Sequence, residues 1–150
     1  MGMMGMLLKR KEDIAAEKVW DDVIKALDNA GYVYDYDQSL CQLMVYEYRY
    51  SNKHMEMFLH HREKDSNWDD GSLFEWMGQG DSLFRVVMID VRENEDMILH
   101  FVHEYLKMNP NDFYWGGGGL EWYYTKEDID RIIEKKYDPI MWCYTNPAEI

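Results

Sequence analysis

Apolar side chains recur at helical spacing between residues 11 and 30. The repeat consists of Ala16, Val19, Trp20, Val23, Ile24 and Leu27. Residues three and four positions apart share one face of a helix, and Gly31 stands where a glycine commonly follows a helix end. The pattern therefore predicts an amphipathic helix over this segment, with its polar face turned to solvent.

Alternating apolar and polar residues predict strands in the next part of the chain. The alternation is visible in residues 32–36 and 43–50, and a third stretch of this kind covers residues 54–61. It is typical of a strand with one buried face. Residues 83–91 are apolar on both sides near the middle, which indicates a strand in the centre of a sheet. We also expect the short apolar segment 140–144 to form a last strand.

Two further helices are predicted in the second half of the chain. One covers residues 95–108, where apolar residues form a single stripe before Asn-Pro ends the helix. The other starts at Thr125, because a threonine followed three residues later by Asp128 predicts a capping box. Tyr124 and Ile129 stand at the two positions of a hydrophobic staple, which gives Tyr124 a structural role.

These elements together predict an α+β fold. We expect an antiparallel sheet of four to five strands, with an N-terminal helix and two later helices packed on it. The length of 150 residues is common for one domain, and no linker rich in Pro, Gly or Ser divides the chain. We therefore expect a single α+β domain over residues 11–150, preceded by a disordered or frayed N-terminus over residues 1–10.

Charge narrows the classes of partner. The chain has 29 acidic and 16 basic residues, a formal net charge of −13. A negative field repels nucleic-acid phosphates and anionic lipids, so we expect neither nucleic acid nor membrane as a partner, and a basic protein fits better. No segment approaches the roughly 20 apolar residues of a membrane span. Cys41 and Cys143 have no metal-ligand spacing and are expected to be buried, reduced thiols, so we expect a cytoplasmic protein.

Four successive glycines, Gly116 to Gly119, separate two aromatic clusters. A phosphate-binding loop would need a Lys followed by Ser or Thr, and the chain has neither there. One interpretation is a mobile loop that joins Trp115 to a short strand over residues 120–123. Another keeps Tyr114, Trp115 and Trp122 as an exposed aromatic platform, because Trp and Tyr dominate binding hot spots.

The segment from residue 65 to residue 81 combines acidic and aromatic side chains. It holds five acidic residues, no basic one, and three large aromatic rings. Acidic charge attracts a basic partner, and aromatic rings supply contact area. An alternative is that Phe74 and Trp76 pack into the core while the acids face water. The partner-binding residues that we predict are Trp68, Asp69, Asp70, Glu75 and Trp76, with Trp115 and Trp122 as a second patch.

Metal and catalytic motifs are incomplete. The segment from Asp65 begins like an EF-hand calcium loop, but Asp70 stands where that loop needs glycine. His60 and His61 point to opposite faces of a strand, and His100 and His103 are expected to face solvent, so no shared metal site is predicted. No nucleophile motif is present. We assign no catalytic residue, metal or cofactor.

The function that these features favour is a non-enzymatic protein-binding domain. In size, charge and architecture the chain resembles small acidic bacterial immunity proteins, and this resemblance implies an inhibitor of a basic toxin such as a nuclease. Two alternatives stay open. The aromatic platform could bind a sugar or heterocycle, which would make the chain a small-ligand module. Paired carboxylates among the many acids could serve a hydrolase.

Overall fold

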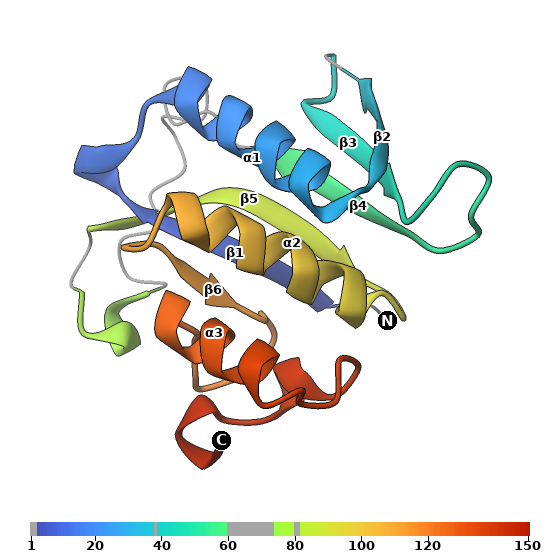
Figure 1. Ribbon diagram of the computed structural model, residues 1–150. Helices are drawn as coiled ribbons and strands as arrows, with labels where there is room; N and C mark the ends of the chain where they lie inside the picture. The colour runs from blue at the N-terminus through green and yellow to red at the C-terminus, as the bar shows by residue number, and fades with distance from the viewer. Residues whose placement is uncertain (1–2, 38, 60–73, 80–81) are drawn as a thin grey trace.

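The computed structural model describes residues 3–37, 39–59, 74–79 and 82–150. These residues form one six-stranded antiparallel sheet and three α-helices (Figure 1). The predicted α+β class is confirmed. The sheet has six strands where four to five were expected, because the patterns at both β1 and β6 were not recognised as strands.

The sheet has the strand order β2-β3-β4-β5-β1-β6, and every neighbouring pair is antiparallel. The strands are β1 (Met3–Arg10), β2 (Val33–Asp37), β3 (Gln42–Tyr46), β4 (His54–Leu59), β5 (Leu83–Val91) and β6 (Phe113–Trp115). The helices are α1 (Ala16–Ala30), α2 (Glu95–Met108) and α3 (Lys126–Glu134). The helix predicted over residues 11–30 therefore begins at Ala16, after a 3-10 turn at Lys11–Asp13.

Residues Met3–Arg10 form an interior strand, so the disordered or frayed segment expected over residues 1–10 is wrong for the eight of these residues that the structure describes. Strand β1 lies between β5 and β6, and its residues from Gly5 to Lys9 are all buried. Leu7 faces the helices, while Met6 and Leu8 face the other side of the sheet. A strand covered on both faces lacks the alternation that marks a half-exposed strand, and this is why its pattern was missed.

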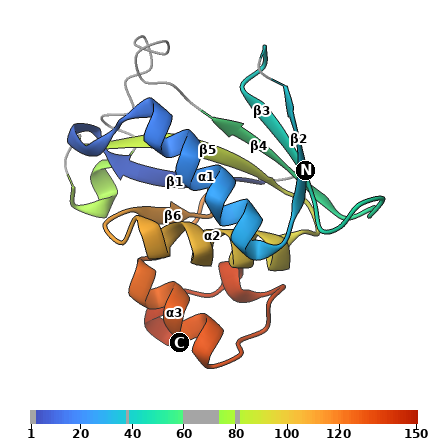
Figure 2. The same cartoon turned by 45° about the horizontal axis from the view of Figure 1, so that its top comes forward.

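Helices α1 and α2 lie side by side over one face of the sheet, and α3 lies beside α2 at the β6 end (Figures 1 and 2). The main core fills the space between these helices and the sheet. It includes Leu27 of α1, Phe101 of α2 and Ile129 of α3, all fully buried. The helices therefore leave the opposite face of the sheet for other contacts.

A second hydrophobic cluster lies on that opposite face, over β1, β5 and β6. Its buried members are Met6, Leu8, Phe74, Met77, Leu83, Phe113 and Trp115. Phe74 directly precedes the short 3-10 turn Glu75–Met77, and both Phe74 and Met77 pack into this cluster. The turn is held by these two buried side chains, which leaves Glu75 and Trp76 between them exposed.

The last strand expected over residues 140–144 is not formed. The segment is a turn that ends in the 3-10 helix Trp142–Tyr144. Ile140 and Met141 are exposed, whereas Trp142 and Cys143 are buried. Two exposed positions followed by two buried ones do not fit a strand, because neighbouring strand residues point to opposite faces. The Trp142 Nε1 donates to the Glu95 carbonyl oxygen at 2.8 Å, which fixes the C-terminal segment to the start of α2.

The glycine bridge packs against β1. Gly117 and Gly118 have φ values of +79° and +60°, and a Cβ atom on Gly117 would lie 2.1 Å from the Met4 carbonyl oxygen. The strand expected over residues 120–123 is absent. After the glycine bridge, Tyr124 forms a single bridge to Tyr114 of β6. Gly116 and Gly117 are buried, so the close approach of β1 explains the glycines better than the expected mobile loop does.

Candidate partner-binding site

Trp76 is the exposed ring of an aromatic cluster on the face opposite the helices. Its ring centroid lies 5.9 Å from that of Trp115 and 6.0 Å from that of Tyr123, and 43% of its surface is exposed. Phe74 meets Trp115 edge to face at 5.8 Å. Aromatic contacts of this geometry are favourable beyond the area that they bury. The Trp76 ring is therefore held in place by Trp115 and Tyr123 in the free protein.

Glu75 directly precedes Trp76 in the chain and carries a negative charge. It is exposed, and it begins the 3-10 turn that Gly78 ends with a φ of +76°. The Gly78 N–H donates to the Glu75 carbonyl oxygen at 3.0 Å, which closes the turn. The other three residues of the first predicted patch, Trp68, Asp69 and Asp70, lie outside the described residues.

The structure separates the two tryptophans of the second predicted patch. Trp115 is only 7% exposed and supports Trp76 from within the second cluster. Trp122 is half-buried against the main core, and its Nε1 donates to the Tyr124 hydroxyl at 3.1 Å. Tyr114 is fully buried in that same core. Tyr114, Trp115 and Trp122 consequently do not form one exposed platform, whereas Trp115 and Trp76, which the sequence placed in different patches, are in contact.

Trp122 borders a shallow depression of about 360 Å³ on the surface beside α3. Glu121, Asp128 and Arg131 contribute its charged groups. Asp128 and Arg131 already form an ion pair with each other. The depression thus offers the half-buried Trp122 indole and the exposed residue Glu121 to an incoming molecule.

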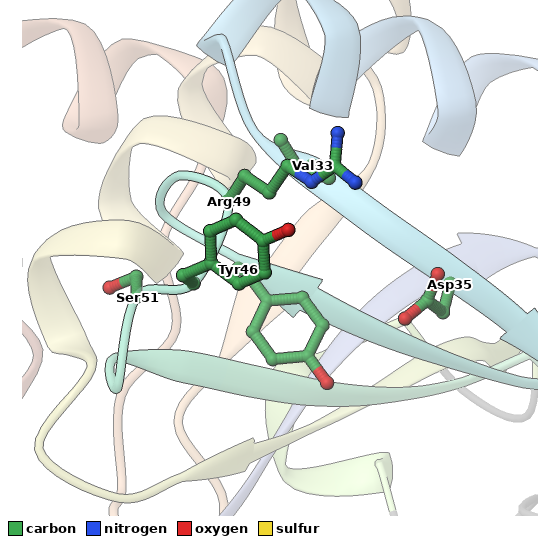
Figure 3. A pocket seen from close by; sticks show the side chains of 6 residues that line it. Val33, Asp35, Tyr46, Arg49 and Ser51 are labelled. Carbon is green, nitrogen blue, oxygen red and sulfur yellow. The ribbon is translucent and has the colours of Figure 1, made fainter.

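A larger hollow of about 620 Å³ lies over β2 and β3, and sequence reasoning did not identify it (Figure 3). Its walls come from two neighbouring strands and from the turn after β3: Val33, Asp35, Tyr46, Arg49, Tyr50 and Ser51. Tyr50 is 87% exposed at a φ of +67°, and the Arg49 guanidinium lies 5.2 Å from its ring centroid. The signal in the sequence was the pattern of tyrosines at alternate positions, which ends in this turn.

Lys9 and Asp112 form a buried ion pair on the helix side of the sheet. The Lys9 Nζ lies 2.9 Å from Asp112 Oδ2 and donates to Asn109 Oδ1 at 3.0 Å. The Tyr105 hydroxyl donates to Asp112 Oδ2 at 2.8 Å. Burial raises the pKa of Asp112, against the lowering effect of Lys9, and burial also raises the pKa of Tyr105 well above its ordinary value. Since all four side chains are buried, the cluster offers no surface to a substrate.

The Cys143 thiol is similarly enclosed. Burial raises the pKa of the Cys143 thiol to about 12, which keeps it in the unreactive neutral form at neutral pH. Cys41 is only half-buried, where both thiols were expected to be buried. His103 lies 3.6 Å from Asp130 between α2 and α3, so the expectation that it faces solvent is wrong. Within residues 3–37, 39–59, 74–79 and 82–150 no three His, Cys, Asp or Glu side chains are grouped as metal ligands.

Comparison with known proteins assigns no family to this chain, so its class follows from its fold and its surface. The chain matches no protein-family model, no curated protein and no solved structure. Among the residues that the structure describes, no helix has the length and apolar character needed to span a membrane. The class that the observations define is an acidic α+β protein with a six-stranded antiparallel sheet and an exposed tryptophan on the face opposite its helices.

Proposed function

We propose that this chain is a non-enzymatic protein-binding domain that engages a basic protein, as an immunity or inhibitor protein for a basic toxin does. The observation that carries the proposal is the exposed Trp76 ring, which Trp115 and Tyr123 support and which follows the exposed Glu75 in the chain. The net charge of −13 supports the sign of the partner.

Both components of an efficient interface are present around Trp76. A tryptophan whose ring is already held by neighbours loses little conformational freedom on binding, and tryptophan is enriched among the residues that dominate binding energy. The negative charges accelerate the encounter with a basic partner, by an amount that falls as salt screens the field. Trp76 is thus the anchor, and Glu75 with the overall charge directs the approach.

The two alternative functions have weaker support. Burial of Tyr114 and Trp115 removes two of the three rings that a sugar or heterocycle platform would use. Among the described residues that line the hollow over β2 and β3, Asp35 is the one carboxylate, whereas carboxylate-dependent hydrolysis uses a pair of acids. Protein binding therefore remains the best supported function.

The test is to isolate the partner and to measure its association. The chain is immobilised in native extract, the retained protein is identified and purified, and its association rate constant is measured at low and at high ionic strength. We expect a partner of net positive charge whose association slows at least about tenfold at high salt. A neutral or acidic partner, or a rate constant unaffected by salt, would contradict the proposal.

Matched variants separate the anchor from general surface effects. Trp76→Ala is expected to weaken binding by about 2 kcal/mol or more, mainly through faster dissociation. Ile140→Ala removes a side chain that is 55% exposed elsewhere and is expected to leave affinity unchanged. Glu75→Lys and Glu134→Lys make the same charge change at two exposed positions, and only the first is expected to slow association strongly.

A further inference from the structure

The two edge strands of the sheet differ in the backbone pairing on their outer sides. At one edge, β6 has its outer side bonded by Tyr124, whose backbone exchanges hydrogen bonds of 2.9 and 2.8 Å with Tyr114. At the other edge, β2 pairs with β3 alone among the described strands (Figures 1 and 2). An edge strand directs the N–H and C=O groups of every second residue away from the sheet, where they can pair with another chain. Within the described part of the chain, β2 is therefore the edge with backbone groups available for pairing.

The acidic side chains on and around β2 favour pairing with a positively charged strand. Four of its five residues are exposed, and Asp35 and Asp37 lie two positions apart on one face. On the other face Asp28 lies beside the Tyr34 hydroxyl, where it adds to the effect of burial in raising the pKa of Tyr34. Acidic groups thus flank both faces of this edge, and oppositely charged pairs across strands are favourable.

The same charges disfavour a second copy of this chain. An antiparallel pair of two β2 strands centred on Asp35 would place that carboxylate opposite its own counterpart. Like charges directly opposite each other destabilise a strand pair, and two chains of net charge −13 repel each other at longer range. A basic strand meets neither penalty.

The hollow of Figure 3 begins at this edge and can receive one side chain of a docked strand. Val33 and Asp35 of β2 border it, and Tyr46 lies across from Val33 in the register of β2 with β3. A long basic side chain has an apolar stem that can cover Val33 and the Tyr46 ring, and a charged end that can meet the Asp35 carboxylate. The Arg49 guanidinium, also in the lining, lies over the Tyr50 ring, so the hollow recognises a basic side chain through Asp35.

We propose that β2 is a docking edge that takes an extended, basic segment of a partner protein by strand addition, with one Lys or Arg side chain in the hollow over β2 and β3. This inference rests on the proposed function, because it uses the same basic partner, and it names a second surface and a mode of binding. Strand addition derives affinity from backbone hydrogen bonds and specificity from pockets for alternate side chains.

The probe for this inference is a blocked peptide of alternating Lys and Val that is long enough to pair with the whole of β2. Two peptides serve as controls. In one, Pro replaces Val, which keeps the charge and an extended shape but removes backbone donors. In the other, Glu replaces Lys. We expect the Lys-Val peptide alone to bind and, at saturation, to slow amide hydrogen exchange in residues 33–37 by about tenfold or more.

Variants of the protein link this protection to the acidic side chains. The double variant Asp35→Lys, Asp37→Lys is expected to lower the affinity for the Lys-Val peptide by about tenfold or more. The single variant Asp35→Asn is expected to lower it by less. Glu134→Lys, an exposed change on α3, is expected to have little effect. Equal binding of the Lys-Pro peptide, or protection outside β2, would overturn the inference. Dimerisation of the chain with protection of β2 would assign the edge to a second copy and would overturn it as well.

The native partner distinguishes a failure of this inference from a failure of the proposed function. If the isolated basic partner binds the Asp35→Lys, Asp37→Lys variant as tightly as the original chain, the docking edge is wrong and the proposed function stands. If the partner that is isolated carries no net positive charge, the proposed function is wrong, whatever the peptides do.

Discussion

At the scale of single residues, the Lys9–Asp112 pair places two opposite charges in the core. Removing two charges from water costs several kcal/mol for each ion, and their attraction offsets this cost only when further hydrogen bonds satisfy both groups. Asn109 and Tyr105 provide those bonds. The pair links β1 to the segment after α2, so it connects the first strand of the chain to residues more than one hundred positions away.

A double-mutant cycle tests this role. Lys9→Met and Asp112→Leu are each expected to lower the free energy of unfolding by about 3–5 kcal/mol, because each leaves the other charge buried without its partner. The double variant is expected to lose less than the sum of the two, measured by urea denaturation. The exposed Lys107–Glu104 pair is the control and is expected to couple by less than about 1 kcal/mol. Additive losses at Lys9 and Asp112 would contradict the assignment.

Gly117 is the residue of the glycine bridge that the fold requires most strictly. Gly117→Ala is expected to destabilise the protein by about 2 kcal/mol or more, since the new Cβ would lie 2.1 Å from the Met4 carbonyl oxygen at a φ of +79°. Gly119→Ala meets no atom within 4 Å and is expected to be neutral or slightly stabilising. Equal midpoints of urea denaturation for the two variants would show that the bridge does not pack on β1 in this way.

At the scale of elements, α3 begins with the capping box that the sequence predicts. The Thr125 side chain accepts from the Asp128 N–H at 3.3 Å, and Asp128 Oδ2 accepts from the Thr125 N–H at 3.0 Å. These two bonds satisfy donors that a helix start leaves without intrahelical partners. The cap therefore fixes where α3 starts, directly after the residue that pairs with β6.

Loss of this cap has a defined cost. Thr125→Ala is expected to lower the free energy of unfolding by about 1 kcal/mol, whereas Thr125→Ser keeps the hydroxyl and is expected to lose much less. For a chain of this length that cost corresponds to a fall of roughly 2–4 °C in the midpoint of thermal unfolding. A Ser variant as unstable as the Ala variant would indicate that the methyl group, not the cap, is responsible.

At the scale of the whole molecule, the main core joins all three helices to the sheet and holds several tyrosine hydroxyls. Burial raises the pKa values of Tyr105, Tyr114 and Tyr124 above the ordinary value of 10.0. The folded chain therefore keeps protons that the unfolded chain releases in alkaline solution. The stabilisation is complete below pH 10.0 and is lost as the pH rises towards the folded-state pKa values.

Alkaline unfolding is the expected consequence. Above pH 10.0 the free energy of unfolding is expected to fall by about 1.4 kcal/mol per pH unit for each buried tyrosine. Phenolate absorbance of the buried rings should rise together with the loss of near-ultraviolet circular dichroism, and Tyr105→Phe should make the dependence on pH less steep. Ionisation of these tyrosines in a chain that stays folded would contradict their burial.

Local sequence signals predicted the helices well. Helix α2 covers the predicted residues, and the Thr125–Asp128 capping box is confirmed. Both signals depend on residues within one or two turns of each other. Strand β1 was missed because its identity as a strand comes from its pairing with β5 and β6, whose residues lie far away along the chain. Met and Gly, which dominate its start, also have weak strand preference.

The positions of the predicted binding residues also depend on contacts between distant segments, and whether these residues bind a partner stays a prediction. Glu75 and Trp76 are exposed, as a binding surface requires. Trp115 contacts Trp76 because β6 pairs with β1 and the 3-10 turn packs across both strands. Trp122, two residues before Tyr124, packs instead on the main core at the other face. The hollow over β2 and β3 needs the register of two strands and the path of a turn, which no local pattern contains.

The sequence by itself determined the acidic charge, the helices, the cap of α3 and the α+β class, because composition, periodicity and capping depend on residues that are near one another along the chain. Only the tertiary structure decided that the first strand lies inside the sheet, that Trp115 is buried while Trp76 is exposed, and that β2 is an edge strand of the described sheet. Each of these depends on which distant segments form hydrogen bonds and bury one another, as Met6 and Trp115 do across β1 and β6.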